Sequence, residues 1–197
     1  CDLTGASTAS GLSTLIGHIF NIGTTTATWT ASDGTNSSTC TYTIVVVDDQ
    51  KPSITCTGNQ ALNADNGGCT YTNSGTAWDA TGSDNCTTVT FSYNLTGATS
   101  GTGSSLNNVA FNRGLTTVTW TATDGSNNTS TCSFTVTISD SQNPTITSAG
   151  NKSVNTDAGV CTYTHSGTAW NPTASDNCGT VTYSYTMSGA TTGTGSS

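Results

Sequence analysis

Residues 115–140 read LTTVTWTATDGSNNTSTCSFTVTISD. Apolar residues alternate with Thr and Ser in both halves, and this period of two is typical of half-buried β-strands. A turn at DGSNN (124–128) separates the halves, because Asp, Gly and Asn favour turns. The positions expected to face a common core are Val118, Trp120, Ala122, Cys132, Phe134, Val136 and Ile138. The stretch therefore predicts a β-hairpin with one buried face.

The same alternation extends outward from this hairpin. TTVTFSYNL (87–95) places Val89, Phe91 and Tyr93 on one face, and KPSITC (51–56) is expected to open the unit as a strand. Glu is absent and the other strong helix formers are scarce, whereas Thr, Ser, Val and Gly dominate. About six to eight short strands in a unit of about 92 residues predict an all-β, immunoglobulin-like β-sandwich.

The sequence repeats itself along the chain. NADNGGCTYTNSGTAW (63–78) returns as NTDAGVCTYTHSGTAW (155–170), 92 residues later in the chain. Such a period indicates tandem units, each long enough to bury its own core. We expect the second part of a first unit at 1–47, a complete unit at 48–139 and the first part of a third unit at 140–197. The chain is accordingly interpreted as a slice of a longer array.

These motifs resemble a known module. The pattern P-x-I-x-C at 52–56, SDNC at 83–86 and the stretch 116–140 are similar to the hyalin repeat (HYR). The resemblance implies an immunoglobulin-like fold and a role in extracellular adhesion, because such modules occur in tandem in very large secreted bacterial surface proteins, including gliding-motility adhesins. Two departures are Thr57, where the module usually has Pro, and Ser148, where the third unit lacks the first Cys.

The charge balance excludes one class of partner. The chain carries 11 acidic residues, all Asp, against three cations, for a net charge of −8. Lys51, Arg113 and Lys152 are too few and too scattered to neutralise a phosphate backbone, so nucleic-acid binding is not expected. No apolar run is long enough to span a bilayer.

Eight cysteines, most of them at repeating positions, indicate disulfides, and hence an extracellular or cell-surface location. Their spacing lacks the close pairs of a zinc site. The four cysteines of the complete unit allow three connectivities. Because the third unit has Ser148 in place of its first Cys, we expect pairing that leaves its remaining cysteines together. The expected bridges are Cys56–Cys132, Cys69–Cys86 and Cys161–Cys178, with Cys1 outside the repeating set and unpaired.

Acidic and amide residues gather in loops that an immunoglobulin-like unit would place at one end. Ca²⁺ prefers six to eight oxygen ligands, often from carboxylates and Asn carbonyls. The candidate calcium ligands are Asp48, Asp49, Asp84, Asn85, Asp124, Asp140, Asp176 and Asn177. The alternative is ordinary turn chemistry, since Asp and Asn bond to their own loops.

Aromatic residues offer a second candidate site. Trp78 and Trp170 share the context GTAW, and an exposed indole on a sandwich can bind a glycan; the alternative is that each covers the edge of a core. Trp29 and Trp120 alternate with apolar residues and are expected in the core. Neither His18 nor His165 has a counterpart in the complete unit, and no catalytic residues are identified. The chain is not expected to be an enzyme.

The resulting hypothesis is a stalk segment of a large extracellular adhesin or cell-surface filament. The linkers DDQKP (48–52) and DSQNP (140–144) are short and contain Pro, which predicts units stacked end to end. The expected partners are neighbouring repeats of the same chain and a surface ligand that the sequence does not identify. The alternatives are glycan- or protein-binding modules, or a spacer attached to a secreted enzyme.

Overall fold

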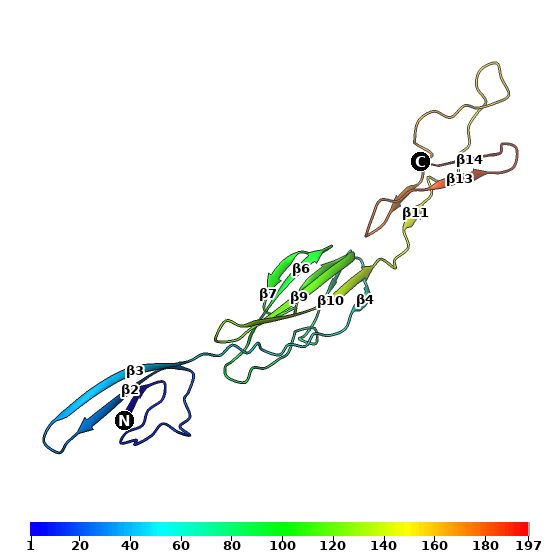
Figure 1. Cartoon of the computed structure of the whole chain (residues 1–197). Coiled ribbons are helices and arrows are strands. Elements are labelled where there is room, and N and C mark those ends of the chain that lie inside the picture. The colour runs from blue at the N-terminus through cyan, green and yellow to red at the C-terminus, as the bar shows by residue number, and fades with distance from the viewer. Residues whose placement is uncertain (197) are drawn as a thin grey trace. The chain divides into compact units, whose positions relative to one another are not determined.

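The computed structural model describes residues 1–196, and every regular element among them is a β-strand (Figure 1). The first part of the chain contains β1 (Asp2–Gly5), β2 (Gly23–Ser32) and β3 (Ser37–Val46). The central part contains β4 (Gln60–Asn63), β5 (Thr70–Thr72), β6 (Thr90–Gly97), β7 (Gly101–Gly103), β8 (Ala110–Asn112), β9 (Gly114–Thr123) and β10 (Thr129–Ser139). The last part contains β11 (Thr145–Thr147), β12 (Thr173–Ser175), β13 (Ser184–Met187) and β14 (Gly193–Ser196). The prediction of an all-β chain is confirmed.

The predicted hairpin forms the centre of the largest sheet. β9 ends at Thr123 and β10 begins at Thr129, with the turn between them. The five strands lie in the order β4-β10-β9-β6-β7, as Figure 1 shows. β4 runs parallel to β10, with Gln60 opposite Val136. The hairpin that the sequence predicts therefore organises the strands on both of its sides.

The core follows the predicted alternation. Successive residues of β9 alternate between buried and half-buried positions from Thr116 onward. A second, two-stranded sheet, β5–β8, contributes Phe111, whose side chain is fully buried. The buried apolar side chains of the central part include Trp78, Leu95, Leu106, Phe111, Val118, Trp120, Ala122, Phe134, Val136 and Ile138. Trp120 lies in the core as predicted, whereas Trp29 is half-buried and its indole N–H donates to the Tyr42 hydroxyl at 3.4 Å.

The same local pairing recurs elsewhere along the chain. β1, β2 and β3 lie in the order β1-β2-β3, as β6, β9 and β10 do. In the last part, Thr147 pairs with Thr173, 92 residues after the bridge between Thr55 and Thr81. Tyr185 likewise lies opposite Gly195. The predicted boundaries of the first and third units remain predictions.

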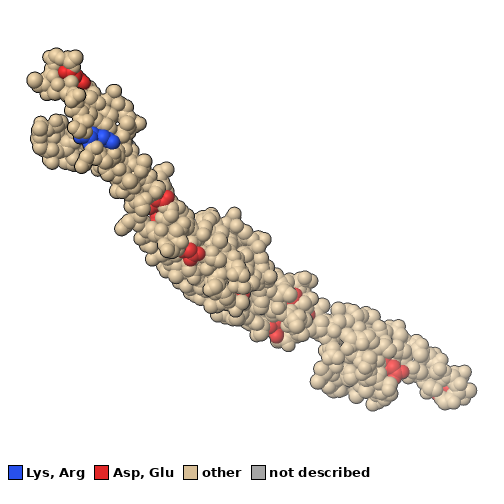
Figure 2. Space-filling view, turned by 180° about the vertical axis from the view of Figure 1, so that it is seen from behind, with Lys and Arg blue, Asp and Glu red and all other residues tan. Residues whose placement is uncertain are grey.

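Internal contacts divide the chain into two compact units. One comprises residues 1–56, 80–92 and 120–132, and the other comprises 57–79, 93–119 and the residues from 133 onward. On the face drawn in Figure 2, the Asp side chains form small separate groups among uncharged residues. Within the described part of the chain, no helix has the length and apolar character needed to cross a bilayer.

Candidate functional site

Two carboxylates and a thiol come together where the central part of the chain begins. Asp48 lies between β3 and β4, whereas Asp84 and Cys86 lie in the segment between β5 and β6. One ligand atom from each of these three residues lies within 4.8 Å of the other two. The group therefore joins two of the loops that the sequence singled out.

The hydrogen bonds leave one oxygen of each carboxylate unused. Asp84 Oδ2 accepts the backbone N–H groups of Cys86 at 2.8 Å and Thr87 at 3.0 Å. Asp84 Oδ1 and Asp48 Oδ2 are buried and have no hydrogen-bond partner. A buried acceptor without a partner costs about 1–3 kcal/mol, so these two atoms favour a site for a cation or an ordered water.

The donor set fits Ca²⁺ only in part. Asp48 and Asp84 provide the hard carboxylate oxygens that Ca²⁺ prefers, but a complete shell needs about six to eight ligands. The Cys86 thiol suits softer metals. Its pKa is raised, first by partial desolvation of the exposed thiol and then by the negative charges of Asp48, Asp84 and Asp124. Calcium binding at this group stays a prediction.

Asp124 is outside the group because its carboxylate builds the β9–β10 turn. It accepts the backbone N–H groups of Ser126 and Asn128, both at 2.8 Å, and the Asn128 side-chain amide at 2.9 Å. Burial by itself would raise the Asp124 pKa, but these hydrogen bonds, led by that of the Asn128 side chain, lower it. Asp124 is therefore a turn former, which is the alternative to a calcium ligand that the sequence left open.

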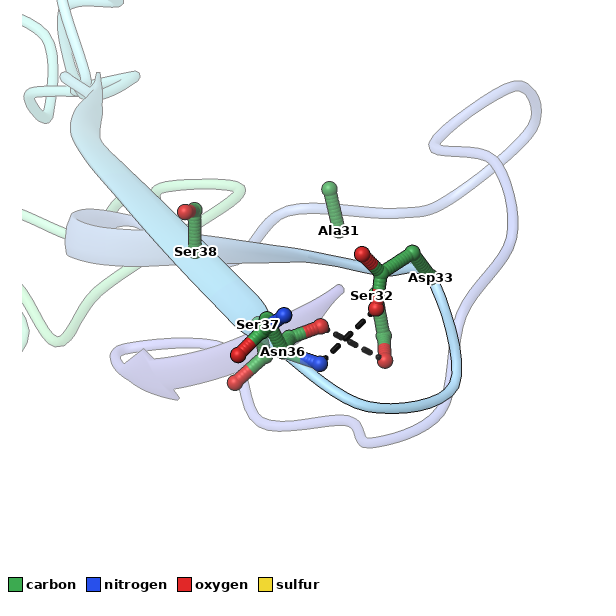
Figure 3. Close-up of a pocket in the computed structure, with 6 residues that line it drawn as sticks. All are labelled: Ala31, Ser32, Asp33, Asn36, Ser37 and Ser38. Carbon is green, nitrogen blue, oxygen red and sulfur yellow. Dashed lines mark hydrogen bonds between the residues drawn. The ribbon is translucent and has the colours of Figure 1, made fainter.

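The β2–β3 turn has the same construction in an exposed setting. Asp33 Oδ1 accepts the backbone N–H groups of Thr35 at 2.9 Å and Asn36 at 2.8 Å. Figure 3 shows the bond from Asn36, together with the bond that the Ser32 hydroxyl donates to the Asn36 carbonyl. The Asn36 hydrogen bond is the main reason that the Asp33 pKa is lowered. The hollow beside this turn, 340 Å³ in volume, is lined by small side chains together with Asp33 and Asn36. Asp33 and Asn36 both make hydrogen bonds within the turn itself.

The remaining candidate calcium ligands lie apart from this group or make other bonds. Asp49 is exposed, and the exposed Asn85 donates its amide to Cys86 Sγ at 3.0 Å. Asp140 Oδ1 accepts the Gln142 N–H at 3.0 Å. Asp176 repeats the geometry of Asp84: its Oδ1 accepts the Cys178 N–H at 2.8 Å and its Oδ2 is buried without a partner. The Asn177 amide donates to the Gly68 carbonyl at 2.7 Å.

Two disulfides are present among the described residues. Cys56 bonds to Cys132, with 5.9 Å between their Cα atoms, and this is one of the pairs that the sequence predicts. Cys69 bonds to Cys178, with 5.0 Å between Cα atoms and a sequence separation of 109. The thiols of Cys1, Cys40, Cys86 and Cys161 are free. The structure thus replaces the expected Cys69–Cys86 and Cys161–Cys178 bridges with a single Cys69–Cys178 bridge.

The expected pairing fails because it assumed that both partners belong to one repeat. Cys69 follows a turn whose residue Ala64 donates its N–H to the Ser139 carbonyl, at the end of β10. Cys86, by contrast, belongs to the group that contains Asp48, at the beginning of the central part. Cys69 and Cys86 therefore have different neighbours. Cys69 contacts the loop after β12, which contains its partner Cys178.

The two tryptophans offered as glycan-binding residues have different surroundings. Trp78 is only 8% exposed. Its ring stacks on Tyr71 and meets Phe111 and Phe134 edge to face, so the core covers it. Trp170 is half-buried, and the His165 ring stacks on it with 3.9 Å between centroids. The alternative of a tryptophan at the edge of a core describes Trp78, and glycan binding at Trp170 stays a prediction.

Sequence reasoning assigned no role to two polar residues that hold the central part together. The Asn128 amide donates to the Asp48 carbonyl at 3.0 Å and so ties the incoming linker to the β9–β10 turn. Asp79 accepts the Ser105 hydroxyl and the Leu106 N–H, both at 2.7 Å, and so holds the loop before β8. The signal for Asp79 was weak, because the third unit has Asn171 at the equivalent position.

The comparison with known families assigns the central part. The family model of the HYR domain matches residues 47–138. These residues are an HYR domain. The matched segment is all-β, includes the β9–β10 hairpin and contains the Cys56–Cys132 bridge. The comparison with curated proteins found no match.

HYR domains are immunoglobulin-like modules of extracellular, adhesion-type proteins, so the predicted fold class is confirmed for the central part. Together with the two disulfides, the HYR domain indicates a secreted or extracellular protein.

Proposed function

We propose that this chain is a non-catalytic stalk segment that transmits tension in a large extracellular adhesin or cell-surface filament. The observation that carries the proposal is the Cys56–Cys132 disulfide. Cys56 lies just after the linker that enters the HYR domain, and Cys132 lies in β10, the last strand of the domain. The bridge therefore joins the two ends of the domain by a covalent bond.

The bridge changes how the domain responds to a pull on its two ends. Tension applied at Asp48 and Ser139 passes through the disulfide and never reaches the chain between the two cysteines. That closed segment has a sequence separation of 76, and fully extended it would span roughly 260 Å. An oxidised domain cannot release this length under tension, and this property suits a stalk.

The polar contacts of the linker support the same role. The Asn128 amide holds the Asp48 carbonyl, and the segment after Cys56 is tied to β10 by the Asn59 side chain, which accepts the Thr135 N–H at 2.9 Å. The entering segment of the domain is therefore fixed to the last hairpin at two points. A short linker anchored in this way transmits tension directly to the sheet.

The test is to stretch single molecules of the full chain carrying C69S/C178S, which removes the second bridge, attached at residues 1 and 197, in oxidising and reducing buffer. The oxidised chain is expected to release less length than the reduced chain, with the difference set by the closed segment. Adding C56S/C132S to the same C69S/C178S background should make the chain behave in oxidising buffer as it does in reducing buffer. Equal extension of the oxidised and reduced chains would contradict the stalk proposal, and tight binding of polysaccharide by the unstretched chain would favour a binding module instead.

A further inference from the structure

The Cys69–Cys178 bridge joins two different positions of the repeat. Cys69 is the second cysteine of the predicted complete unit, whereas Cys178 lies 92 residues after Cys86, the third cysteine of that unit. The bond therefore connects the second position of one unit with the third position of the next. Cys161 and Cys86 are the other two cysteines at these positions, and both are exposed free thiols.

The loop around Cys161 has the same construction as the loop around Cys69. Gly67 and Gly159 have nearly identical positive φ angles, 79° and 78°. The equivalent backbone bonds run from Asp65 N–H to Thr70 O and from Asp157 N–H to Thr162 O, each 2.7 Å. The equivalent side-chain bonds run from Thr72 N–H to Asp65 Oδ2 at 2.9 Å and from Thr164 N–H to Asp157 Oδ2 at 2.8 Å. Cys161 is thus presented as Cys69 is.

The loops around Cys86 and Cys178 also agree. The N–H of each cysteine donates to the Asp two residues earlier, at 2.8 Å in both loops. The intervening Asn amide contacts the cysteine sulfur, at 3.0 Å from Asn85 and 3.2 Å from Asn177. Cys86 is thus held as Cys178 is, although only Cys178 has a bonding partner.

We propose that Cys86 and Cys161 are the two complementary ends of a head-to-tail disulfide, in which the Cys161 position of one repeat bonds to the Cys86 position of another. The reaction is thiol–disulfide exchange with a small-molecule disulfide. One thiolate attacks that disulfide and releases a small thiol, and the second protein thiolate then attacks the mixed disulfide and releases another. The protein gains one S–S bond, and the small disulfide is reduced to two thiols.

The structure also indicates what selects the correct partner. The Asn177 amide donates to the Gly68 carbonyl, the residue before Cys69, at 2.7 Å. The equivalent residues in the free loops are Asn85 and Val160. An Asn85 amide that donates to the Val160 carbonyl of another copy would bring Cys86 and Cys161 together, whereas two Cys86 loops or two Cys161 loops lack this complementarity.

The experiment uses the full chain with C1S and C40S, so that Cys86 and Cys161 are the only free thiols. The protein is oxidised in a glutathione redox buffer at increasing concentration, and covalent dimers are mapped by mass spectrometry without reduction. A mixture of ¹⁵N-labelled and unlabelled chain separates bonds between copies from bonds within a copy. The expected dimer joins Cys161 of one copy to Cys86 of the other, and each copy retains its Cys69–Cys178 bridge.

Single variants in this background supply the matched controls. C86S alone and C161S alone should each lose the dimer, and mixing the two variants should restore it. N85A, added to the C161S variant, should weaken the dimer restored by mixing. It removes the Asn85 amide that is proposed to select the partner loop, and it leaves both reacting thiols in place. Symmetric Cys86–Cys86 or Cys161–Cys161 dimers in equal amount, a bond between Cys86 and Cys161 of the same copy, or protein that stays monomeric would each overturn the proposal. This experiment maps which cysteines are bonded and does not measure the response to tension. A result that overturns the head-to-tail disulfide would therefore leave the proposed stalk function unaffected.

Discussion

The β2–β3 and β9–β10 hairpins have nearly the same sequence pattern but very different burial. TWTASDG (28–34) corresponds to TWTATDG (119–125), and both stretches form a long strand followed by an Asp-anchored turn. Tyr42 in β3 is nevertheless 46% exposed, whereas Phe134 at the equivalent position of β10 is 3% exposed. The alternation thus specifies the hairpin, and the packing against the hairpin decides whether a core forms.

The packing comes from segments well before the second hairpin in sequence. Trp78 meets Phe134, and β4 pairs with β10. In the described residues, β2–β3 pairs only with β1. Matched substitutions in the two hairpins therefore measure what the surrounding domain contributes.

The largest difference is expected at the paired tryptophans. W120A removes a fully buried indole and should destabilise the HYR domain by about 3–5 kcal/mol, the usual cost of such a cavity. W29A removes a half-buried side chain and should leave the midpoint of that transition unchanged. Urea unfolding followed by tryptophan fluorescence measures both effects. Equal losses in the two variants would mean that the hairpins do not differ in packing.

The next difference concerns the equivalent cysteines Cys40 and Cys132. C132S breaks the bridge to Cys56 and should lower the free energy of unfolding by about 2–4 kcal/mol. C40S changes a free thiol and should have no measurable effect. Thermal unfolding of both variants in oxidising buffer is the measurement. Reduction of a C69S/C178S chain, which has only the Cys56–Cys132 bridge, should reproduce the loss seen for C132S.

The turn aspartates predict a smaller, pH-dependent difference. The pKa of Asp124 is lowered in the folded state, and such a carboxylate stabilises the fold above its unfolded-state value of about 3.9. That contribution is lost as the pH falls below this value toward the folded-state pKa. D124N should therefore flatten the acid side of the stability profile. D33N is the control, and it should leave the unfolding of the HYR domain unchanged at every pH; an unchanged profile in D124N would contradict the assignment.

The smallest expected effect is that of calcium. If Asp48 and Asp84 bind the ion, addition of Ca²⁺ should raise the melting temperature of the parent chain, and a chelator should reverse the shift. D84A should abolish the response, and D49A, which changes an exposed carboxylate outside the group, should retain it. A melting temperature that neither Ca²⁺ nor chelator changes would identify Asp84 as a turn former.

Much of the fold could be predicted from local pattern, because period-two alternation and Asp-Gly turns act over a few residues. The β9–β10 hairpin and its inward side chains illustrate this. The Cys69–Cys178 bond could not be found in this way, since spacing within one repeat says nothing about which repeat supplies the partner. The role of Asp124 was equally hidden, because the same Asp-Gly sequence serves a metal site or a turn, and only the hydrogen bonds from Asn128 separate them.

The two disulfides are interleaved in sequence, since Cys69 lies inside the loop closed by Cys56 and Cys132 and Cys178 lies outside it. A protease that cuts the chain once between Cys56 and Cys132 leaves the two fragments joined by the first bridge. A single cut between Cys132 and Cys178 leaves them joined by the second. Wherever one peptide bond is broken from residue 56 to residue 178, the two ends of the molecule stay connected. An extracellular protein thereby gains a tolerance to proteolytic damage that neither bridge alone would provide.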